Sequence, residues 1–320
     1  MPSSPKIIQL IHPGAQFFKA RSNDEIIWNK DHKTGKREWN YRKNKRSNHY
    51  RKFISSNNAG YLDANLKLKK GNITFFGEWE PPSNFKLINT EESFRRLVHK
   101  PIFNFKNQNT QSDKELFNTD PYVFGNNFWY TNCKQKKKHT LRNLSSNSII
   151  IFGTEYGKKD AGFFYVDTIF IIKRRFSYSE IDYETSLISD PLRKATINLL
   201  SEEYRTKYGY YQGLMYQDNR NYFSFVPAKI QEHGKEKYHE RLKLNVRDYD
   251  FKSMKYNKKF KRYHGAGTGI KEMDPFFNDK YKKSELGDTL SSEVLSSFWH
   301  RIVDECFKQG FVLGVHLPED

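Results

Sequence analysis

Residues 148–153 read SIIIFG, and residues 163–172 read FFYVDTIFII. Both runs are rich in β-branched and aromatic side chains, which favour a pleated strand over a helix. The first run is apolar throughout, as expected of a strand that is buried on both faces. The nine residues between the two runs, 154–162, contain Gly and Lys and read as a connection. The sequence therefore predicts an antiparallel hairpin here, in the densest β region of the chain.

Shorter segments on both sides of this hairpin predict further strands and two helices. One helix is expected to begin at Asp190-Pro191 and to end at Gly209, and the other covers residues 291–308. Strands dominate and helices come late, so the predicted fold class is α+β. We expect a curved, mostly antiparallel sheet or partial barrel, with flanking helices and long basic loops. The further strands are expected at residues 7–11, 72–80, 222–227 and 311–315.

The chain of 320 residues is long enough for one large domain or two smaller ones. We divide it into three parts. Residues 1–117 form the N-terminal part with a basic loop at 30–52, and residues 118–230 form a β-rich core. Residues 231–320 hold a basic insertion, the C-terminal helix and a closing strand.

Positive charge is concentrated in three segments. The net charge is +18, and residues 30–52, 134–142 and 235–262 carry +8, +5 and +7, so that the rest sums to about −2. The first and third segments also contain aromatic residues and Asn, and such a pattern is typical of a surface that binds phosphate. The basic residues predicted to contact nucleic acid are Lys43, Lys45, Arg46, Lys136, Lys137, Lys138, Lys258, Lys259, Lys261 and Arg262.

A cluster of rings leads directly into the second basic segment. Residues 118–130 read NTDPYVFGNNFWY. Aromatic rings stack on bases while neighbouring lysines hold phosphates, so Phe124, Trp129 and Tyr130 are candidates for a base-binding pocket. The alternative is that these rings fill the core beneath the loop.

No motif in the chain names a reaction, and whether the protein is an enzyme stays open. Glu78 and Glu80 lie on the same face of a predicted strand, because side chains alternate with period two. Together with His12 at the end of another strand, they could bind metal or act as acid and base. The alternative is a solvated strand end. No metal site and no cofactor are assigned.

Three further patterns fail as chemical sites. The glycine-rich residues 265–269 do not follow a buried strand, as a phosphate-binding loop would, and read as a flexible loop. The region His32 to His49 lacks the strands of an HNH nuclease. Asp167 has no second acid at nuclease spacing, so we expect a neighbouring residue to satisfy it.

Two isolated cysteines, Cys133 and Cys306, form neither a disulfide framework nor a metal-ligand pair. The N-terminus lacks an apolar signal-peptide core, and the apolar runs are shorter than the ~20 residues that span a bilayer. We expect a reduced, cytoplasmic protein without a membrane partner. The oligomeric state is open.

Residues 118–230, with the hairpin of SIIIFG and FYVDTIFII at their centre, resemble PUA-like barrels, the group of the EVE, YTH and ASCH domains. That resemblance implies a small curved barrel holding a flipped or modified base in an aromatic pocket. The wider set HPG (12–14), GEWE (77–80), NTDP (118–121) and FSFVP (223–227) is similar to uncharacterised bacterial families placed near nucleotide-modification or defence systems.

The leading hypothesis is therefore a nucleic-acid-binding protein, for which the resemblance implies a bacterial defence or base-modification context. Its basic loops would hold the backbone of DNA or RNA, and an aromatic pocket would receive a base. One alternative is an enzyme acting on nucleic acid or nucleotides, such as a hydrolase or nuclease. Another is a module that binds an acidic protein partner.

Overall fold

The structure is a computed structural model. It describes residues 4–11, 52–77, 83–88, 96–103, 122–124, 127–130, 135, 139–156, 162–177, 208–218, 221–231, 240–245, 248–249, 255–257, 262–264, 270–272 and 290–317.

Most of the described residues belong to β-strands, and one α-helix, α6 (Ser292–Lys308), is described with them. Two 3-10 helices are η3 (His139–Arg142) and η5 (Tyr216–Asp218). The strands are β1 (Ile7–Ile11), β2 (Lys52–Leu62), β3 (Leu68–Gly77), β4 (Ser83–Ile88), β5 (Arg96–Phe103), β6 (Tyr122–Phe124), β7 (Asn127–Tyr130), β8 (Ile149–Tyr156), β9 (Phe163–Phe176), β10 (Tyr210–Gly213), β11 (Val226–Ile230), β12 (Leu242–Asn245), β13 (Lys255–Asn257), β14 (Arg262–His264), β15 (Ile270–Glu272) and β16 (Val312–His316).

The larger sheet is built around the predicted hairpin. Its strands follow the order β15-β1-β8-β9-β10-β7-β6, and β12 also pairs with β9. β8 and β9 are antiparallel, with Ile149 opposite Ile171 and Phe152 opposite Thr168. β1 runs parallel to β8, whereas the other neighbouring pairs in this sheet are antiparallel. The long strand β9 pairs with three described strands, β8, β10 and β12, and so connects the parts of the sheet.

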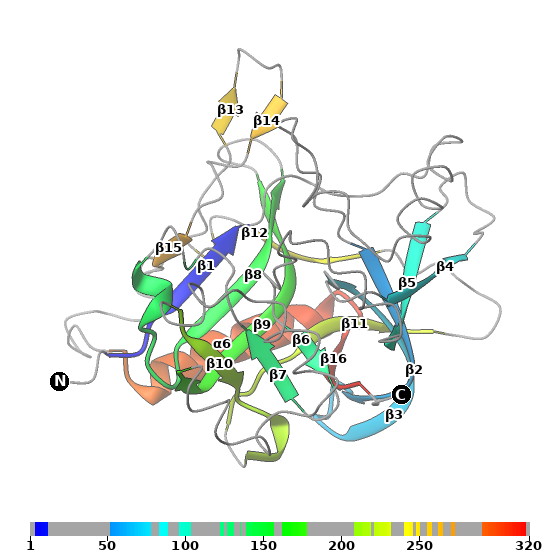
Figure 1. The fold of residues 1–320 in the computed structure, drawn as a ribbon, viewed down its shortest axis with the longest axis horizontal. Helices are drawn as coiled ribbons and strands as arrows, with labels where there is room; N and C mark the ends of the chain where they lie inside the picture. Colours follow the sequence, from blue (N-terminus) through cyan, green and yellow to red (C-terminus); the bar gives the residue numbers. More distant parts are fainter. Residues whose placement is uncertain are drawn as a thin grey trace.

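The smaller sheet closes on itself. β2 pairs with β3, β3 with β11, β11 with β16, and β16 returns to β2, each time antiparallel. β5 runs parallel to β2, and β4 pairs with the outer edge of β5. The four-membered ring is a small closed barrel, on the right of Figure 1, which removes the open edges that its strands would otherwise present.

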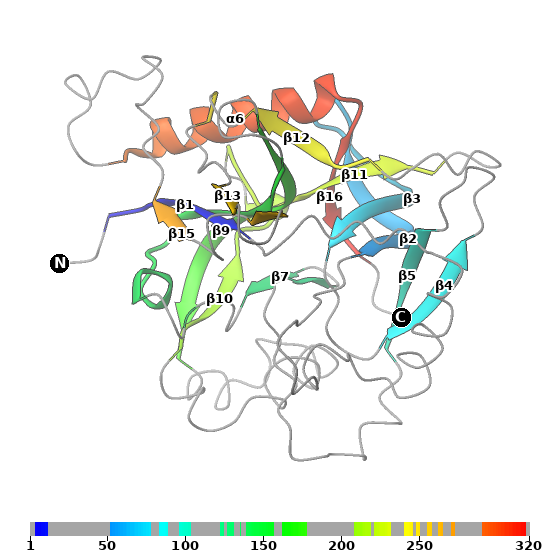
Figure 2. The ribbon, with the colours of Figure 1, turned by 90° about the horizontal axis from the view of Figure 1, so that it is seen from above.

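Both faces of the larger sheet are buried at the start of β8, where alternate side chains point to opposite faces. Ile149 and Ile151 pack in an apolar cluster that includes Trp299 of α6. Ile150 and Phe152 point to the opposite face and belong to a second cluster, which continues into the barrel. Figure 2 shows α6 lying along one face of the sheet near β1 and β9. The uninterrupted apolar sequence at the start of β8, residues 149–153, follows from this burial on two sides.

Helix α6 has defined ends and a fixed contact with the sheet. The Ser291 hydroxyl caps its N-terminus by accepting a hydrogen bond from the Val294 N–H at 3.3 Å. Gly310 follows the C-terminus with a φ of 71°, a conformation that favours glycine. The Trp299 indole N–H donates to the Phe223 carbonyl oxygen at 2.9 Å, which ties the buried face of α6 to the segment that leads into β11.

Gly153 provides a test of the central hairpin. A Cβ atom at this position would overlap the Tyr165 carbonyl oxygen and the Phe164 ring on the facing strand. Gly153→Ala is therefore expected to destabilise the protein by about 1–3 kcal/mol or more, measured by urea unfolding. Gly71→Ala is the milder comparison, because its added Cβ would lie 3.2 Å from Tyr61 Cε1. Equal midpoints for the two variants would contradict the close approach of β8 and β9.

The structure confirms the predicted hairpin, the C-terminal helix and the strands at both ends of the chain. The described residues are mostly β with one helix and a small barrel, which is compatible with an α+β fold and a partial barrel. The strand predicted at 222–227 begins later, at Val226, because Phe225 makes only an isolated bridge with Ile169 of β9. The helix predicted from Asp190 lies outside the described residues.

The three predicted parts share both sheets. β1 and β2 come from residues 1–117, β8 and β11 from 118–230, and β15 and β16 from 231–320. The described residues of these parts therefore fold against one another. No helix in the described part of the chain is long and apolar enough to cross a bilayer.

Candidate nucleic-acid interface

Three consecutive cations lie near the end of the long strand β9. Lys173, Arg174 and Arg175 are all exposed, although the nine residues before them are buried. Between Ile172 and Arg174, β9 has one residue more than its partner β10, so Lys173 is the extra residue of a bulge. A bulge bends the strand and redirects its side chains. This explains how neighbours that would otherwise alternate between two faces all reach solvent.

The fold brings the second basic segment to this strand end. Arg175 Nε donates a hydrogen bond to the Arg142 carbonyl oxygen at 2.7 Å. Arg142 Nε in turn donates to the Gln135 carbonyl oxygen at 2.8 Å, and its guanidinium lies 5.3 Å from the centre of the Tyr208 ring. The contact between Arg142 and Gln135 joins the two ends of the segment 135–142. The predicted lysines 136–138 lie between these two residues in the sequence.

Buried polar contacts hold both ends of the segment 135–142. The Gln135 side chain is buried and pairs with the backbone of Gly209, donating through Nε2 at 2.7 Å and accepting through Oε1 at 2.8 Å. At the other end, the Tyr211 hydroxyl donates to the Leu141 carbonyl oxygen at 2.7 Å and accepts from the Leu144 N–H at 3.2 Å. Burial raises the pKa of Tyr211 to about 12, so the hydroxyl keeps its proton at neutral pH.

We call Arg142, Lys173, Arg174 and Arg175 the basic cluster. Guanidinium groups present several donors in a planar fork that matches phosphate oxygens, and lysine adds a mobile point charge. Arg174 also lies over the Phe176 ring, 4.4 Å from its centre, which orients the guanidinium at the surface. The cluster carries four cationic side chains whose donors are of the kind that bind phosphate oxygens.

Arg142 belongs to the predicted basic segment 134–142, whereas residues 173–175 were not among the predicted site residues. A signal was available, because three consecutive cations directly follow an apolar strand without an intervening turn. Such a pattern indicates a strand that extends from the core to the surface while it still pairs with a neighbouring strand.

The structure places Trp129 and Tyr130 in the core. Both rings have no exposed surface. Trp129 stacks on Tyr210 at a centroid distance of 5.2 Å, and Tyr130 stacks on Tyr211 at 5.6 Å. Neither ring has a face open to a base, so the alternative interpretation, core packing, holds for both. Phe124 lies in β6, whose side chains are outside the described part of the structure.

One predicted cation is placed by its backbone. Arg262 begins β14 and lies opposite Asn257 of β13, so residues 258–261 connect the two strands of a hairpin. Figure 1 shows β13 and β14 projecting from the rest of the fold.

The remaining predicted site residues lie outside the described residues; they are His12, Glu78, Glu80, Lys43, Lys45, Arg46, Lys136, Lys137, Lys138, Lys258, Lys259 and Lys261.

Two buried ionisable groups outside the basic cluster, Asp167 and Cys306, contribute to the core and do not face a ligand site. Asp167 forms an ion pair with Arg241, and both side chains are fully buried, which confirms that a neighbour satisfies Asp167. Arg241 belongs to the basic segment 235–262 but cannot reach a ligand at the surface. Cys306 is buried, and burial raises the pKa of its thiol, which makes it unreactive. No group of three or more His, Cys, Asp or Glu side chains among the described residues could hold a metal.

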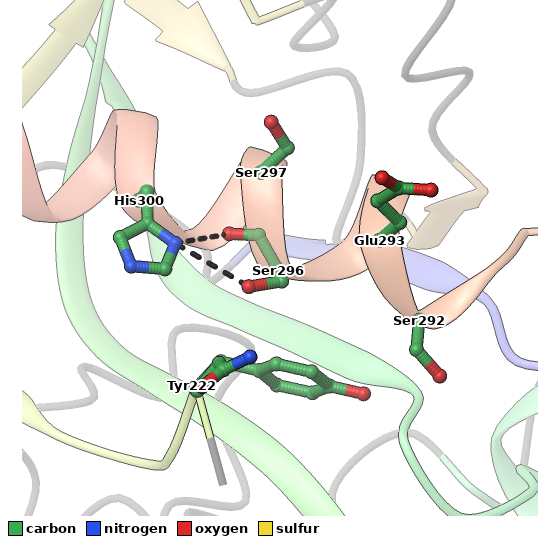
Figure 3. A pocket seen from close by; sticks show the side chains of 7 residues that line it. Tyr222, Ser292, Glu293, Ser296, Ser297 and His300 are labelled. Atoms are coloured by element: carbon green, nitrogen blue, oxygen red, sulfur yellow. Dashed lines mark hydrogen bonds between the residues drawn. The ribbon is translucent and has the colours of Figure 1, made fainter.

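A polar pocket of about 610 Å³ lies beside the N-terminal half of α6. Its described lining carries hydroxyl, amide, carboxylate and imidazole groups but no Lys or Arg, so a phosphate would find no full positive charge there. Figure 3 shows the helix side chains of the pocket above Tyr222. The described lining residues are Asn221, Tyr222, Ser292, Glu293, Ser296, Ser297 and His300.

The geometry of His300 limits the chemistry of this pocket. Its Nδ1 lies 2.8 Å from the Ser296 carbonyl oxygen and 3.4 Å from the Ser296 hydroxyl (Figure 3). A carbonyl oxygen can only accept, so this contact places a hydrogen on Nδ1 and leaves Nε2 as the basic nitrogen of the neutral ring. Nδ1 therefore cannot take a proton from Ser296. The pair lacks the arrangement that activates a serine nucleophile.

Comparisons with protein-family models, with curated proteins and with solved structures find no match to this chain.

Proposed function

We propose that this protein binds nucleic acid through the basic cluster and the adjoining segment 135–142. The observation that carries the proposal is the chain of contacts from Arg175 to Arg142 to Gln135. Two basic stretches separated by about thirty residues of sequence meet at one place, which concentrates charge beyond what either stretch provides. Phosphate contacts of this kind supply affinity and position the ligand without reading its sequence.

The β13–β14 hairpin supports the same function. It is antiparallel and two-stranded, and the residues that connect its strands include Lys258, Lys259 and Lys261. A two-stranded ribbon has dimensions that the major groove of DNA admits. Trp129 and Tyr130 are buried in the core and cannot receive a base, so any base selection belongs to other groups.

Salt titration tests the proposal. Fluorescence anisotropy would measure the affinity for duplex DNA, single-stranded DNA and single-stranded RNA at 50 and 200 mM salt. If six to ten cations contact phosphate, affinity is expected to fall by about 10³–10⁵-fold between these conditions. An affinity that stays constant across this range would overturn the electrostatic mechanism.

The same titration distinguishes the two alternatives. A module for an acidic protein would bind none of the three nucleic acids. An enzyme would bind and then turn its ligand over, which gel analysis of the bound oligonucleotide with and without divalent metal would reveal. Intact, salt-sensitive complexes are the result expected of a binding protein.

A further inference from the structure

The tip of the β2–β3 hairpin exposes two leucines among lysines. Residues 63–70 read DANLKLKK. Leu66 is 41% exposed and Leu68 is 51% exposed, and both are among the large apolar side chains that the described residues leave in solvent. Lys67, Lys69 and Lys70 are exposed beside them. This tip, residues 63–70, lies outside the three basic segments of the sequence.

The hairpin tip is held in one conformation. Asp63 Oδ1 accepts hydrogen bonds from the N–H groups of Asn65 at 3.0 Å and Lys67 at 3.1 Å. The Leu66 N–H donates to the Asp63 carbonyl oxygen at 2.8 Å, and Lys69 Nζ lies 2.8 Å from Asp63 Oδ2. Lys69 and these backbone donors lower the pKa of Asp63, which therefore stays charged at neutral pH. The leucines are presented on a preorganised turn.

Leu66 occupies an unfavourable backbone conformation. Its φ is 56°, in the left-handed region that glycine and asparagine adopt most readily. A leucine at this position strains the backbone and gains little from burial, because much of its side chain stays in water. Folding does not account for this residue, and an outlier of this kind points to a role in binding.

The charges at the tip select the class of partner. Three lysines and one aspartate give the tip a net positive charge, which is complementary to a polyanion. Apolar side chains flanked by cations can insert between bases while the cations hold the adjacent phosphates. A bilayer surface would be expected to meet a broader apolar face than two leucines.

We infer that the β2–β3 tip is a wedge that packs Leu66 and Leu68 against nucleic-acid bases while Lys67 and Lys70 contact phosphate. This inference rests on the proposed function and adds to it a second contact with a different mechanism. The basic cluster holds the backbone, whereas the tip would locally unstack the bases.

The test compares two double variants with one single variant that serves as the control. Leu66→Gly/Leu68→Thr removes the apolar groups, and glycine accepts the φ of residue 66, so the thermal midpoint is expected to stay at or above that of the wild type. Lys67→Gln/Lys70→Gln removes two charges. Ile230→Thr is the matched control, because Ile230 is 40% exposed at the end of β11, opposite Ile73 of β3 and outside the tip residues 63–70.

The leucine variant is expected to bind oligonucleotides roughly tenfold or more weakly at every salt concentration, with an unchanged salt dependence, because the lost contact is apolar. The lysine variant is expected to reduce the slope of log affinity against log salt by about 2. In an oligonucleotide containing 2-aminopurine, wild-type binding should raise the fluorescence through unstacking, and the leucine variant should not. Ile230→Thr should match the wild type in all three measurements.

Several outcomes would overturn the inference. If the wild type binds oligonucleotides and the leucine variant binds equally well with the same fluorescence, the wedge is wrong and the proposed function stands. If the wild type binds none of the oligonucleotides, both fail together. Sedimentation with vesicles of phosphatidylserine and phosphatidylcholine gives the third outcome. Vesicle binding that the leucine variant loses, with oligonucleotide binding unchanged, would assign the tip to a membrane surface.

Discussion

Replacing Lys173 and Arg174 with glutamine is expected to weaken nucleic-acid binding about 100-fold near 0.1 M salt. Each phosphate contact releases about one counterion, so each lost contact costs roughly a factor of ten at this salt concentration. The slope of log affinity against log salt should also fall by about 2. Both side chains are exposed, so the thermal midpoint should change little. Anisotropy titrations at several salt concentrations would measure affinity and slope together.

Lys243→Gln/Lys308→Gln is the control for this variant. It removes the same two charges from exposed positions on β12 and at the end of α6, outside the basic cluster. If charge acts only through the net charge of the protein, both double variants will weaken binding equally. An equal loss would contradict the basic cluster, and a loss confined to Lys173 and Arg174 would support it.

Helices and hairpins, whose residues are close together in the sequence, could be predicted from local sequence patterns. The hairpin of β8 and β9 follows from two apolar runs and a short connection, and α6 follows from its apolar stripe, Ser291 and Gly310. A partial barrel with a closing strand was expected, but the strand pairings that close it could not be predicted in the same way. β16 pairs with β2 across most of the chain length, and nothing in the sequence of either strand identifies the other as its partner.

The candidate site shows the same difference between features that are local in the sequence and contacts that depend on the fold. The lysines at 134–142 and the three cations at 173–175 are each visible in the sequence. Their meeting is not, because the contact between Arg175 and Arg142 depends on the fold. The rings of Trp129 and Tyr130 looked equally suited to stacking on bases and to packing. Their partners, Tyr210 and Tyr211, lie about eighty residues further on, so only the pairing of β7 with β10 decides between the two.

The largest effect on stability is expected from Asp167→Asn. Asp167 and Arg241 pair with no exposed side-chain surface, and the guanidinium lies 4.1 Å from the centre of the Phe76 ring on β3. Removing the carboxylate charge leaves the guanidinium buried without its counterion, which is expected to cost about 3–5 kcal/mol. Urea unfolding would measure this loss. Asp63→Asn is the matched control, because it removes the carboxylate of an ion pair with the exposed Lys69, and it should change the midpoint little.

A second variant separates charge from packing at the same position. Asp167→Leu/Arg241→Met replaces both partners with apolar side chains, so no charge is left buried. Replacement of a buried pair by apolar groups of similar volume is often neutral or stabilising, by about 1–4 kcal/mol. The double variant is therefore expected to unfold near the wild-type midpoint or above it, although Asp167→Asn unfolds well below it. If the conservative Asp167→Asn change leaves the midpoint unaltered, Arg241 does not depend on this carboxylate, and the buried ion pair between β9 and the start of β12 is refuted.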